Sequence, residues 1–303
     1  MDRLDQMTAY VAILEEGSLA AAARRLGSSP PAVSRALVAL EERLGVPLIR
    51  RTTRRLAPTE AGLRYFKTCQ RLLADIESAD REATGEGGEP HGLLRVTAPL
   101  LFGRMYVAPV VTAFVERHRE ARAELMLIDR IVDLIDEGVD VAIRIGQLPD
   151  SSLVARKVGQ VRRVLVASPD YLARKGTPRS LRDLATHDVV AFSGITGPET
   201  WRFRTPMGPV SVPIRPRLIF NQADPAIAAV CDGFGISRIL SYQVAEHVRA
   251  GRLILLMDEI EDDPLPVQVV YDQHRLPNAK VRAFVDLAVE MLSREMTRRL
   301  GAQ

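Results

Sequence analysis

The sequence contains 303 residues, of which 47% are hydrophobic and 26% charged, and its net charge at pH 7 is +3. This length suits about two domains, and the composition is that of an ordinary globular protein. Residues 1–14 carry Asp2 and Asp5 in a helical pattern instead of a basic and apolar leader, and no apolar run is long enough to span a bilayer. We therefore expect a cytoplasmic protein.

The two cysteines, Cys69 and Cys231, fall in what the pattern indicates are separate domains. This argues against a disulfide framework, and we interpret both as small buried apolar residues rather than redox switches. The motifs HExxH, CxxC and GxxxxGK[ST] do not occur in the chain. We therefore expect no metal site, no cofactor and no catalytic residues.

Two short helices joined by a tight turn are predicted between Ser18 and Gly45. Residues 19–26 repeat apolar side chains at helical spacing behind Ser18, a residue type favoured at an N-cap, and Gly27 ends this first helix. A further amphipathic helix over residues 4–14 can cover the pair. Three helices in this order predict a helix-turn-helix unit, although an ordinary αα-hairpin fits the same residues.

The second helix of the pair has one apolar and one polar face. Ser29 can cap it, and Pro30 and Pro31 fit its first turn, where their missing amide hydrogens would have had no intrahelical partner. Ser34 and Arg35 lie on the polar face near the helix start. In a helix-turn-helix unit, side chains at these places reach base edges in the major groove. The opposite, apolar stripe consists of Val33, Leu37, Leu40 and Leu44.

Arginines cluster in the turn-rich segment that follows, residues 47–62. Between Arg24 and Arg71 there are eleven Arg and Lys residues against three Glu, whereas the whole chain carries a net charge of only +3. Such a concentration beside a reading helix suits phosphate neutralisation, and arginine also enters a narrow minor groove readily. An ordinary solvated basic surface is the alternative. The arginines of the segment are Arg50, Arg51, Arg54 and Arg55.

The run over residues 4–62, with AAARRLGSSPPAVSRALVALEERLGVPLIRRTTRRLAPTEAG at its centre, resembles the winged helix-turn-helix of LysR-type transcriptional regulators. In that family a Ser-Arg pair of the recognition helix and an arginine of the wing contact DNA. Two departures occur: Pro30 stands where many members carry a polar residue able to read a base, and Ile49 replaces the usual Phe of the wing. The implied DNA-binding residues are Ser29, Pro30, Pro31, Ser34, Arg35, Arg50, Arg51 and Arg54.

A long helix is predicted over residues 59–84, after a DNA-binding domain at 1–58. At 1.5 Å per residue, about 25 residues make a rod of roughly 37 Å whose apolar seam suits pairing with a second copy. Packing on its own chain is the alternative, but the resemblance implies a dimerisation linker and hence a homo-oligomer, as a dimer and also a tetramer. Residues 85–92, GEGGEPHG, have the Gly, Pro and charge content of a hinge.

Beyond the hinge, strand-like runs alternate with helical ones, which predicts α/β architecture with largely parallel sheets. The resemblance implies a two-lobed domain over 93–303, similar to periplasmic binding proteins, with an effector cleft between the lobes. Lobe I is expected at 93–160 and 272–303, and lobe II at 161–271. The predicted strands are 94–97, 124–128, 139–145, 163–167, 189–192, 217–220, 236–240 and 267–271, and the predicted helices are 103–118, 131–136, 223–231, 242–248 and 280–300.

Candidate effector-binding loops follow the carboxyl ends of these strands, where ligands bind in open α/β sheets. Arg130 or Arg144 would favour an anion, although either can instead pair with Asp129 or Asp133. Trp201, the only tryptophan, fits either a lid over an apolar ligand or the core of lobe II. The candidates are Thr97, Ala98, Pro99, Leu100, Asp129, Arg130, Arg144, Gly146, Phe192, Ser193, Trp201, Asn221 and Gly233.

The GxG of DGFGISRIL invites a nucleotide-loop interpretation, but Arg238 occupies the place of the third glycine. Gly233 and Gly235 also precede the predicted strand instead of following it, so we interpret them as a helix-ending turn. The resemblance extends over essentially the whole chain, including residues 140–158.

The leading hypothesis is a transcriptional regulator that binds double-stranded DNA and whose grip changes with a small-molecule effector. An enzyme is a first alternative, but the five histidines are too scattered to form a motif. A cytoplasmic small-molecule receptor is a second, against which the basic head counts. Salt-dependent affinity for DNA separates the regulator from the receptor.

Overall fold

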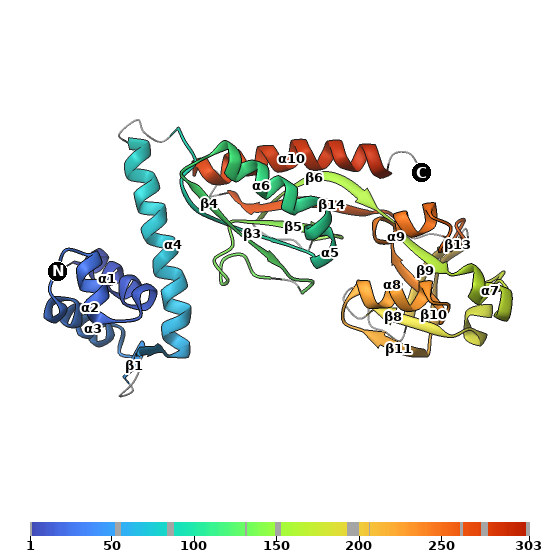
Figure 1. The fold of residues 1–303 in the computed structure, drawn as a ribbon, viewed down its shortest axis with the longest axis horizontal. Helices are drawn as coiled ribbons and strands as arrows, with labels where there is room; N and C mark the ends of the chain where they lie inside the picture. The colour runs from blue at the N-terminus through green and yellow to red at the C-terminus, as the bar shows by residue number, and fades with distance from the viewer. Residues whose placement is uncertain are drawn as a thin grey trace.

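A computed structural model describes residues 2–51, 56–83, 88–130, 132–148, 153–192, 200–205, 207–260, 263–273 and 278–300. A helical head, a long helix and two α/β lobes follow one another along the molecule (Figure 1). Within the described residues, none of the helices combines the length and apolar character needed to traverse a bilayer.

The head is a three-helix bundle with a short hairpin. The hydroxyls of Ser18 and Ser29 accept hydrogen bonds from backbone amides three residues further on, as expected of N-caps. Tyr10, Leu37 and Leu40 lie at the centre of the bundle and are fully buried, so the three apolar faces form one core. The elements are α1 (Arg3–Glu16), α2 (Leu19–Arg25), α3 (Pro30–Leu44), β1 (Ile49–Arg51) and β2 (Leu56–Pro58).

The long helix is α4 (Glu60–Ala83), whose 24 residues span about 36 Å. The hydroxyl of Thr59 accepts a hydrogen bond from the amide of Gly62, so Thr59 caps the helix as its sequence predicts. Phe66 and Cys69 on one side pack against the core of the head, whereas Leu72 stays 41% exposed.

Lobe I is a five-stranded sheet in the order β4-β3-β5-β14-β6. Helix α10 packs against α6 and against strand β6, and the two helices cover the sheet (Figure 1). The elements are β3 (Gly92–Ala98), α5 (Leu100–Phe102), the π-helix η1 (Gly103–Val107), α6 (Ala108–Arg117), β4 (Ala121–Leu127), β5 (Val141–Ile145), β6 (Leu153–Val161), β14 (Leu265–Asp272) and α10 (Ala279–Leu300).

Lobe II is a second five-stranded sheet in the order β11-β8-β12-β7-β13, with a separate hairpin packed on it. Its strands are β7 (Arg163–Ala167), β8 (Val189–Phe192), β11 (Pro216–Phe220), β12 (Ile236–Leu240) and β13 (Ile254–Leu256). Its helices are α7 (Pro169–Lys175), η2 (Asp183–Thr186), α8 (Ala223–Cys231) and α9 (Ser241–Arg249), and the hairpin consists of β9 (Thr200–Thr205) and β10 (Gly208–Pro213).

Largely parallel sheets were the wrong expectation. Each five-stranded sheet combines two parallel with two antiparallel pairings: in lobe I the antiparallel pairs are those of the return strand β14, and in lobe II those of β7. Strand β14 pairs with β5 and β6, so it belongs to the sheet of lobe I and not to lobe II, where the boundary at 272 had placed it.

The helix predicted over residues 131–136 is also wrong for its described part. Residues 134–138 form turns, and the carboxylate of Asp133 accepts hydrogen bonds from the amides of Ile135 and Asp136 at 2.8 and 3.0 Å. An aspartate that bonds the backbone two residues on stabilises a turn in competition with a helix.

Candidate nucleic-acid interface and effector-binding loops

The start of α3 presents the residues expected to read DNA. Ser29, Pro30, Pro31 and Arg35 are exposed, and Ser34 is half-buried. The Arg35 guanidinium makes no hydrogen bond or ion pair with any described residue, while the stripe behind it fills the core of the head. A guanidinium held on a rigid helix and free of partners is available to the two acceptors of a guanine.

The hairpin that follows forms the wing. Ile49 pairs with Pro58 and Arg50 with Ala57 in an antiparallel ladder. Ile49 is buried in the core of the head, so it fills the place of the family's usual Phe, whereas Arg50 is exposed. Arg51 ends β1 and is described by its backbone alone, and the predicted contact Arg54 lies outside the described residues.

Part of the positive charge counted in the sequence is neutralised within the protein. Arg25 pairs with Glu15 at 2.5 Å, and Arg64 pairs with Glu60 at 2.5 Å. The described surface that remains for an anionic partner includes Arg24 and Arg50, which are exposed and make no ion pair with any described acid. The basic excess in the sequence therefore overstates the charge that faces outward.

Two of the predicted effector residues lie inside the sheet of lobe I instead of lining a cleft. Thr97 is fully buried and donates its hydroxyl hydrogen to the carbonyl of Met126 at 3.0 Å, and Ala98 is also fully buried. The backbone amide of the candidate Leu100, at the start of α5, donates to the carboxylate of Asp129 at 3.0 Å. This amide at the helix start is therefore already bonded to a carboxylate of the protein itself.

Arg130 and Arg144 also have partners, but not the predicted ones. Arg130 makes two hydrogen bonds with the carboxylate of Glu137, at 2.6 and 2.8 Å, and the bonds lower the pKa of Glu137. Arg144 donates to the carbonyl of Val132 at 3.4 Å, and burial lowers its pKa. Gly146, at the end of β5, donates its amide to the carbonyl of Pro266 and thereby joins the return strand.

In lobe II, Trp201 is 4% exposed on β9 and packs edge-to-face on Phe203 within the lobe's core. The lid interpretation is therefore wrong and the core interpretation holds. Gly233 has a φ of 81° at the end of α8, where its carbonyl accepts a hydrogen bond from Arg174 at 2.6 Å. This is the helix-ending turn predicted from the glycines. It lies at the C-terminal end of α8, whereas Asp224 in the first turn of the same helix contacts Arg104 of lobe I.

Among the remaining candidates, the described ones lie at or directly after the ends of strands. Pro99 precedes α5 and is half-buried. Phe192 ends β8 and packs against the core, Asn221 follows β11 and is exposed, and Ser193 lies outside the described residues.

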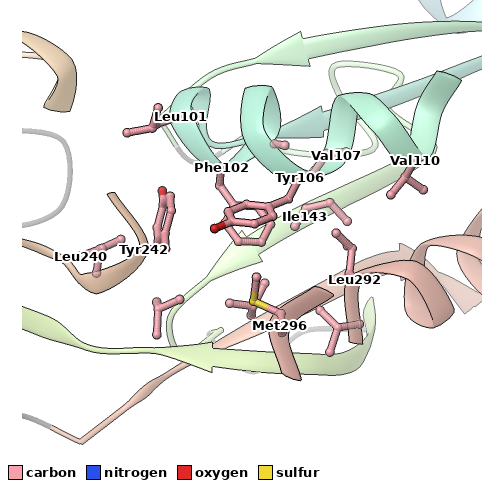
Figure 2. Packing of buried hydrophobic residues seen from close by; sticks show 14 of the residues in the cluster. Leu101, Phe102, Tyr106, Val107, Val110, Ile143, Leu240, Tyr242, Leu292 and Met296 are labelled. Carbon is pink, nitrogen blue, oxygen red and sulfur yellow. The ribbon is translucent and has the colours of Figure 1, made fainter. Parts of the chain in front are cut away.

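Side chains of the two lobes meet directly at this level. Tyr242 of lobe II lies against Phe102 and Tyr106 of lobe I, with ring centroids 5.3 and 5.9 Å apart and near-perpendicular rings (Figure 2). We call these three residues the interlobe aromatic cluster. Tyr242 is 2% exposed, and Arg104 faces Asp224 across the lobes at 3.4 Å. The two lobes therefore contact each other directly through these side chains.

A hollow of about 470 Å³ lies where β6 and β14 connect the two lobes. Residues of both lobes line it, and its polar groups come chiefly from arginines on β7 and β9, of which Arg204 pairs with Asp263. Sequence reasoning missed these arginines, although the alternation WRFRT over residues 201–205 is a strand signal that places them on one face. The lining includes Gln147, Arg163, Arg202, Phe203, Arg204 and Leu265.

Within the described residues, no group of three or more His, Cys, Asp or Glu side chains is placed to hold a metal ion. Both cysteines are free thiols; Cys69 is buried, and burial raises its pKa to about 11. Cys231 lies 3.0 Å from Nδ1 of His247, and burial raises its pKa as well.

Comparisons with known proteins agree with this architecture. The family model for the bacterial regulatory helix-turn-helix protein, lysR family, matches residues 4–63, and that for the LysR substrate binding domain matches residues 87–293. The regulator CrgA of Neisseria meningitidis serogroup C (strain 8013) is 34% identical over 96% of this chain and 98% of its own. PtxR of Pseudomonas aeruginosa is 35% identical over 96% of this chain and 94% of its own.

Solved structures show the same likeness. That of CrgA from Neisseria meningitidis is 34% identical, covers 95% of this chain and 98% of its own, and superimposes with a TM-score of 0.61. The full-length Vibrio cholerae virulence activator AphB is 28% identical, with 95% and 99% covered and a TM-score of 0.61.

A winged helix-turn-helix head joined to a two-lobed ligand-binding domain defines a DNA-binding transcriptional regulator with an effector-binding domain. The two family models together cover nearly the whole chain. The chain belongs to the LysR family of transcriptional regulators.

Proposed function

We propose that this regulator reads a specific DNA sequence with the start of α3 and holds the backbone with the wing. The observation that carries the proposal is Arg35, which is exposed and free of described partners on a helix whose other face is buried. The proposed DNA contacts of the described residues are Ser29, Pro30, Pro31, Ser34, Arg35 and Arg50, and the likeness to the family adds Arg51 and Arg54.

Two copies joined through α4 would place two recognition helices on a two-fold related site. Leu72 and Ile76, one helical turn apart, stay 41% and 38% exposed, which supports pairing of this face with a second copy. Each head covers a half-site, so pairing increases affinity without a new base contact. We infer that the chain acts as a homo-oligomer, a dimer through α4 with further assembly to a tetramer.

A small molecule between the lobes would supply the regulation. The proposal is supported by the contact of Arg104 with Asp224 across the lobes, a few residues along the chain from Pro99 and Asn221, and by the hollow that residues of both lobes line. An effector that binds one lobe arrangement better than another shifts the population toward it. The enzyme and receptor alternatives have no described observation in their favour, and reproducible turnover by the purified protein would revive the first.

The test is a salt titration of DNA binding. A duplex enriched from a random pool by the protein, and a scrambled duplex of equal length, are each titrated at several salt concentrations. We expect log Kobs to fall steeply with log salt for both, and the enriched duplex to bind roughly 10³-fold or more tighter. Weak binding without a salt slope would contradict a DNA-binding role and favour a receptor.

A second test is truncation after residue 84. The fragment keeps the head core and α4, so we expect it to bind DNA with reduced site occupancy, because the two-lobed domains no longer support assembly. Site occupancy is measured by footprinting the fragment and the full chain on the enriched duplex. Full-length affinity in the fragment would show that residues 85–303 add nothing to assembly.

A further inference from the structure

The C-terminal half of α3 contacts the base of the wing through Glu41. Oε1 of this half-buried carboxylate accepts hydrogen bonds from two successive backbone amides, of Leu48 at 2.7 Å and of Ile49 at 3.1 Å. Ile49 is the first residue of β1. Hydrogen bonds to an ionised acceptor are among the stronger ones, and two of them from consecutive amides fix the direction of the chain as well as its position.

The opposite side of Leu48 is held just as closely by the start of α4. Its carbonyl accepts a hydrogen bond from the amide of Thr59 at 2.9 Å. Gly62 approaches the same carbonyl so closely that an added Cβ would lie 2.0 Å from its oxygen. The hydroxyl of Tyr10 donates to the carbonyl of Gly62 at 2.8 Å, which ties α1 into the same place. Leu48 thus joins the recognition helix, the wing and the long helix.

The wing depends on this joint for its orientation. Its two strands have three residues each, and an isolated two-stranded hairpin is marginal in water. The hairpin lies beside the N-terminal end of α4, away from the rest of the molecule (Figure 1). The side chains of Leu48 and Ile49 anchor its base in the core, but apolar contacts are not directional. Direction comes from the hydrogen bonds: the Thr59 amide holds the Leu48 carbonyl on the side of α4, and the Glu41 carboxylate holds the Leu48 and Ile49 amides on the side of α3.

We propose that Glu41 is a positioning residue for DNA binding: by holding the amides of Leu48 and Ile49 it sets the wing relative to α3. Arg50, the next residue along β1, then reaches the DNA backbone while the start of α3 lies in the major groove. The inference rests on the proposed DNA-binding function. Glu41 itself contacts no DNA, since its carboxylate points at the base of the wing.

The test compares Glu41→Ala, Arg50→Ala and the double variant in the full chain. Enriched and scrambled duplexes are titrated at several salt concentrations. Each single variant is expected to flatten the slope of log Kobs against log salt by about 1 for each head bound to the duplex, the share of one phosphate contact, and to leave the ratio between the two duplexes within about two-fold. The double variant is expected to bind no more weakly than either single one, because both remove the same contact.

Two control variants complete the design. Glu42→Ala removes the same charge from the neighbouring, exposed position and is expected to keep the full slope. Glu41→Gln keeps an oxygen acceptor and is measured in place of Glu41→Ala if the alanine variant does not fold. Its slope is expected to lie between those of the alanine variant and the unaltered protein. Thermal unfolding of each variant checks that the head is folded.

The outcomes separate this inference from the proposed function. A slope in folded Glu41→Ala or Glu41→Gln equal to that of the unaltered protein would overturn it, as would additive losses in the double variant. A loss confined to the ratio between enriched and scrambled duplexes would overturn it too, because it would place Glu41 in sequence reading. If the unaltered protein itself lacks a salt-dependent affinity for DNA, the proposed function fails first.

Discussion

Single residues take their roles in this protein from the face on which they lie. Ser34 and Arg35 follow Val33, and one hundred degrees of helical rotation per residue carries them from the buried to the exposed side. Arg35 is left without an acidic partner among the described residues, whereas Arg25, ten residues earlier, is paired with Glu15. The same residue type is therefore free for an external partner at one position and paired within the head at the other.

Replacing Arg35 by alanine is expected to impair sequence recognition selectively. Loss of a bidentate contact to a base costs about 1–3 kcal/mol, so binding to an enriched duplex should weaken roughly ten- to a hundred-fold, with a much smaller change on a scrambled duplex. Competition binding of both duplexes at one salt concentration measures the ratio. Equal losses on the two duplexes would show that Arg35 contacts phosphate only.

The buried thiol of Cys69 predicts a loss of stability at high pH. Burial raises its pKa from 9.0 to about 11, so its native environment favours the protonated form. This contribution is fully present below pH 9 and is lost as the pH rises toward 11, by on the order of 2 kcal/mol. Denaturant unfolding at pH 8 and pH 10.5 measures the loss. It should be smaller in Cys69→Ala, and an equal loss in both proteins would contradict the assignment.

At the scale of elements, the head is organised around the meeting of α3, the wing and α4. The strands of the wing have three residues each, too few for a hairpin that is stable by itself. Helix α4 begins directly after Thr59, whose amide donates to the carbonyl of Leu48 and whose hydroxyl caps the helix. Only glycine fits at residue 62, because the carbonyl oxygen of Leu48 occupies the place that a Cβ would take. Contacts at Leu48 thereby join the recognition helix α3 to the long helix α4.

Gly62→Ala is expected to destabilise the head although alanine favours helices. The added methyl group would lie 2.0 Å from the carbonyl oxygen of Leu48, so backbone must shift, at a cost of about 1–3 kcal/mol or more. Thermal unfolding of the full chain, followed by the head's transition, measures the change. Gly88→Ala is the matched control, because nothing lies within 4 Å of its added Cβ, and it should unfold like the unaltered protein. Equal behaviour of the two variants would contradict the close approach.

At the scale of the whole molecule, the two lobes share one continuous core. Tyr242 belongs to the same buried cluster as Phe102 and Tyr106, and its ring is held between the lobes (Figure 2). The π-helix η1 carries Tyr106 into this contact, and such irregular turns commonly occur at functional places. Any change in the angle between the lobes must repack this cluster, so an effector that alters the angle has to offset the loss of these contacts.

Tyr242→Ala is expected to lower stability by about 3–5 kcal/mol, as for other large buried side chains, and to loosen the lobes. Tyr242→Phe keeps the ring and loses only a hydrogen bond from Gln243 at 3.3 Å, so its cost should stay below about 1.5 kcal/mol. Urea unfolding compares the two variants, and small-angle scattering reports the spread of the lobes. A mild effect of the alanine variant would show that the cluster does not hold the lobes together.

Local patterns in the sequence were enough for most elements and for the exposure of Arg35 at the start of α3. Strands β7, β8 and β12 and helix α8 begin and end where they were predicted. Strand β6 was missed because charged and half-exposed residues interrupt its apolar positions. The effector candidates were predicted less well. Thr97 and Gly233 lie at a strand end and a helix end, as the chain pattern predicts, but Thr97 is buried and bonded to Met126, and Gly233 is bonded to Arg174.

By itself the sequence determined the helices of the head, the exposure of Arg35 and the length of α4, because all three follow from residue spacing along one helix. Tertiary structure alone decided that β14 returns to lobe I, that Asp129 occupies the amide of Leu100 and that Tyr242 lies between the lobes. Each of these contacts joins residues at least 29 positions apart. Spacing along a chain carries no information about which distant groups share a site, whereas packing and the need of buried polar groups for partners do.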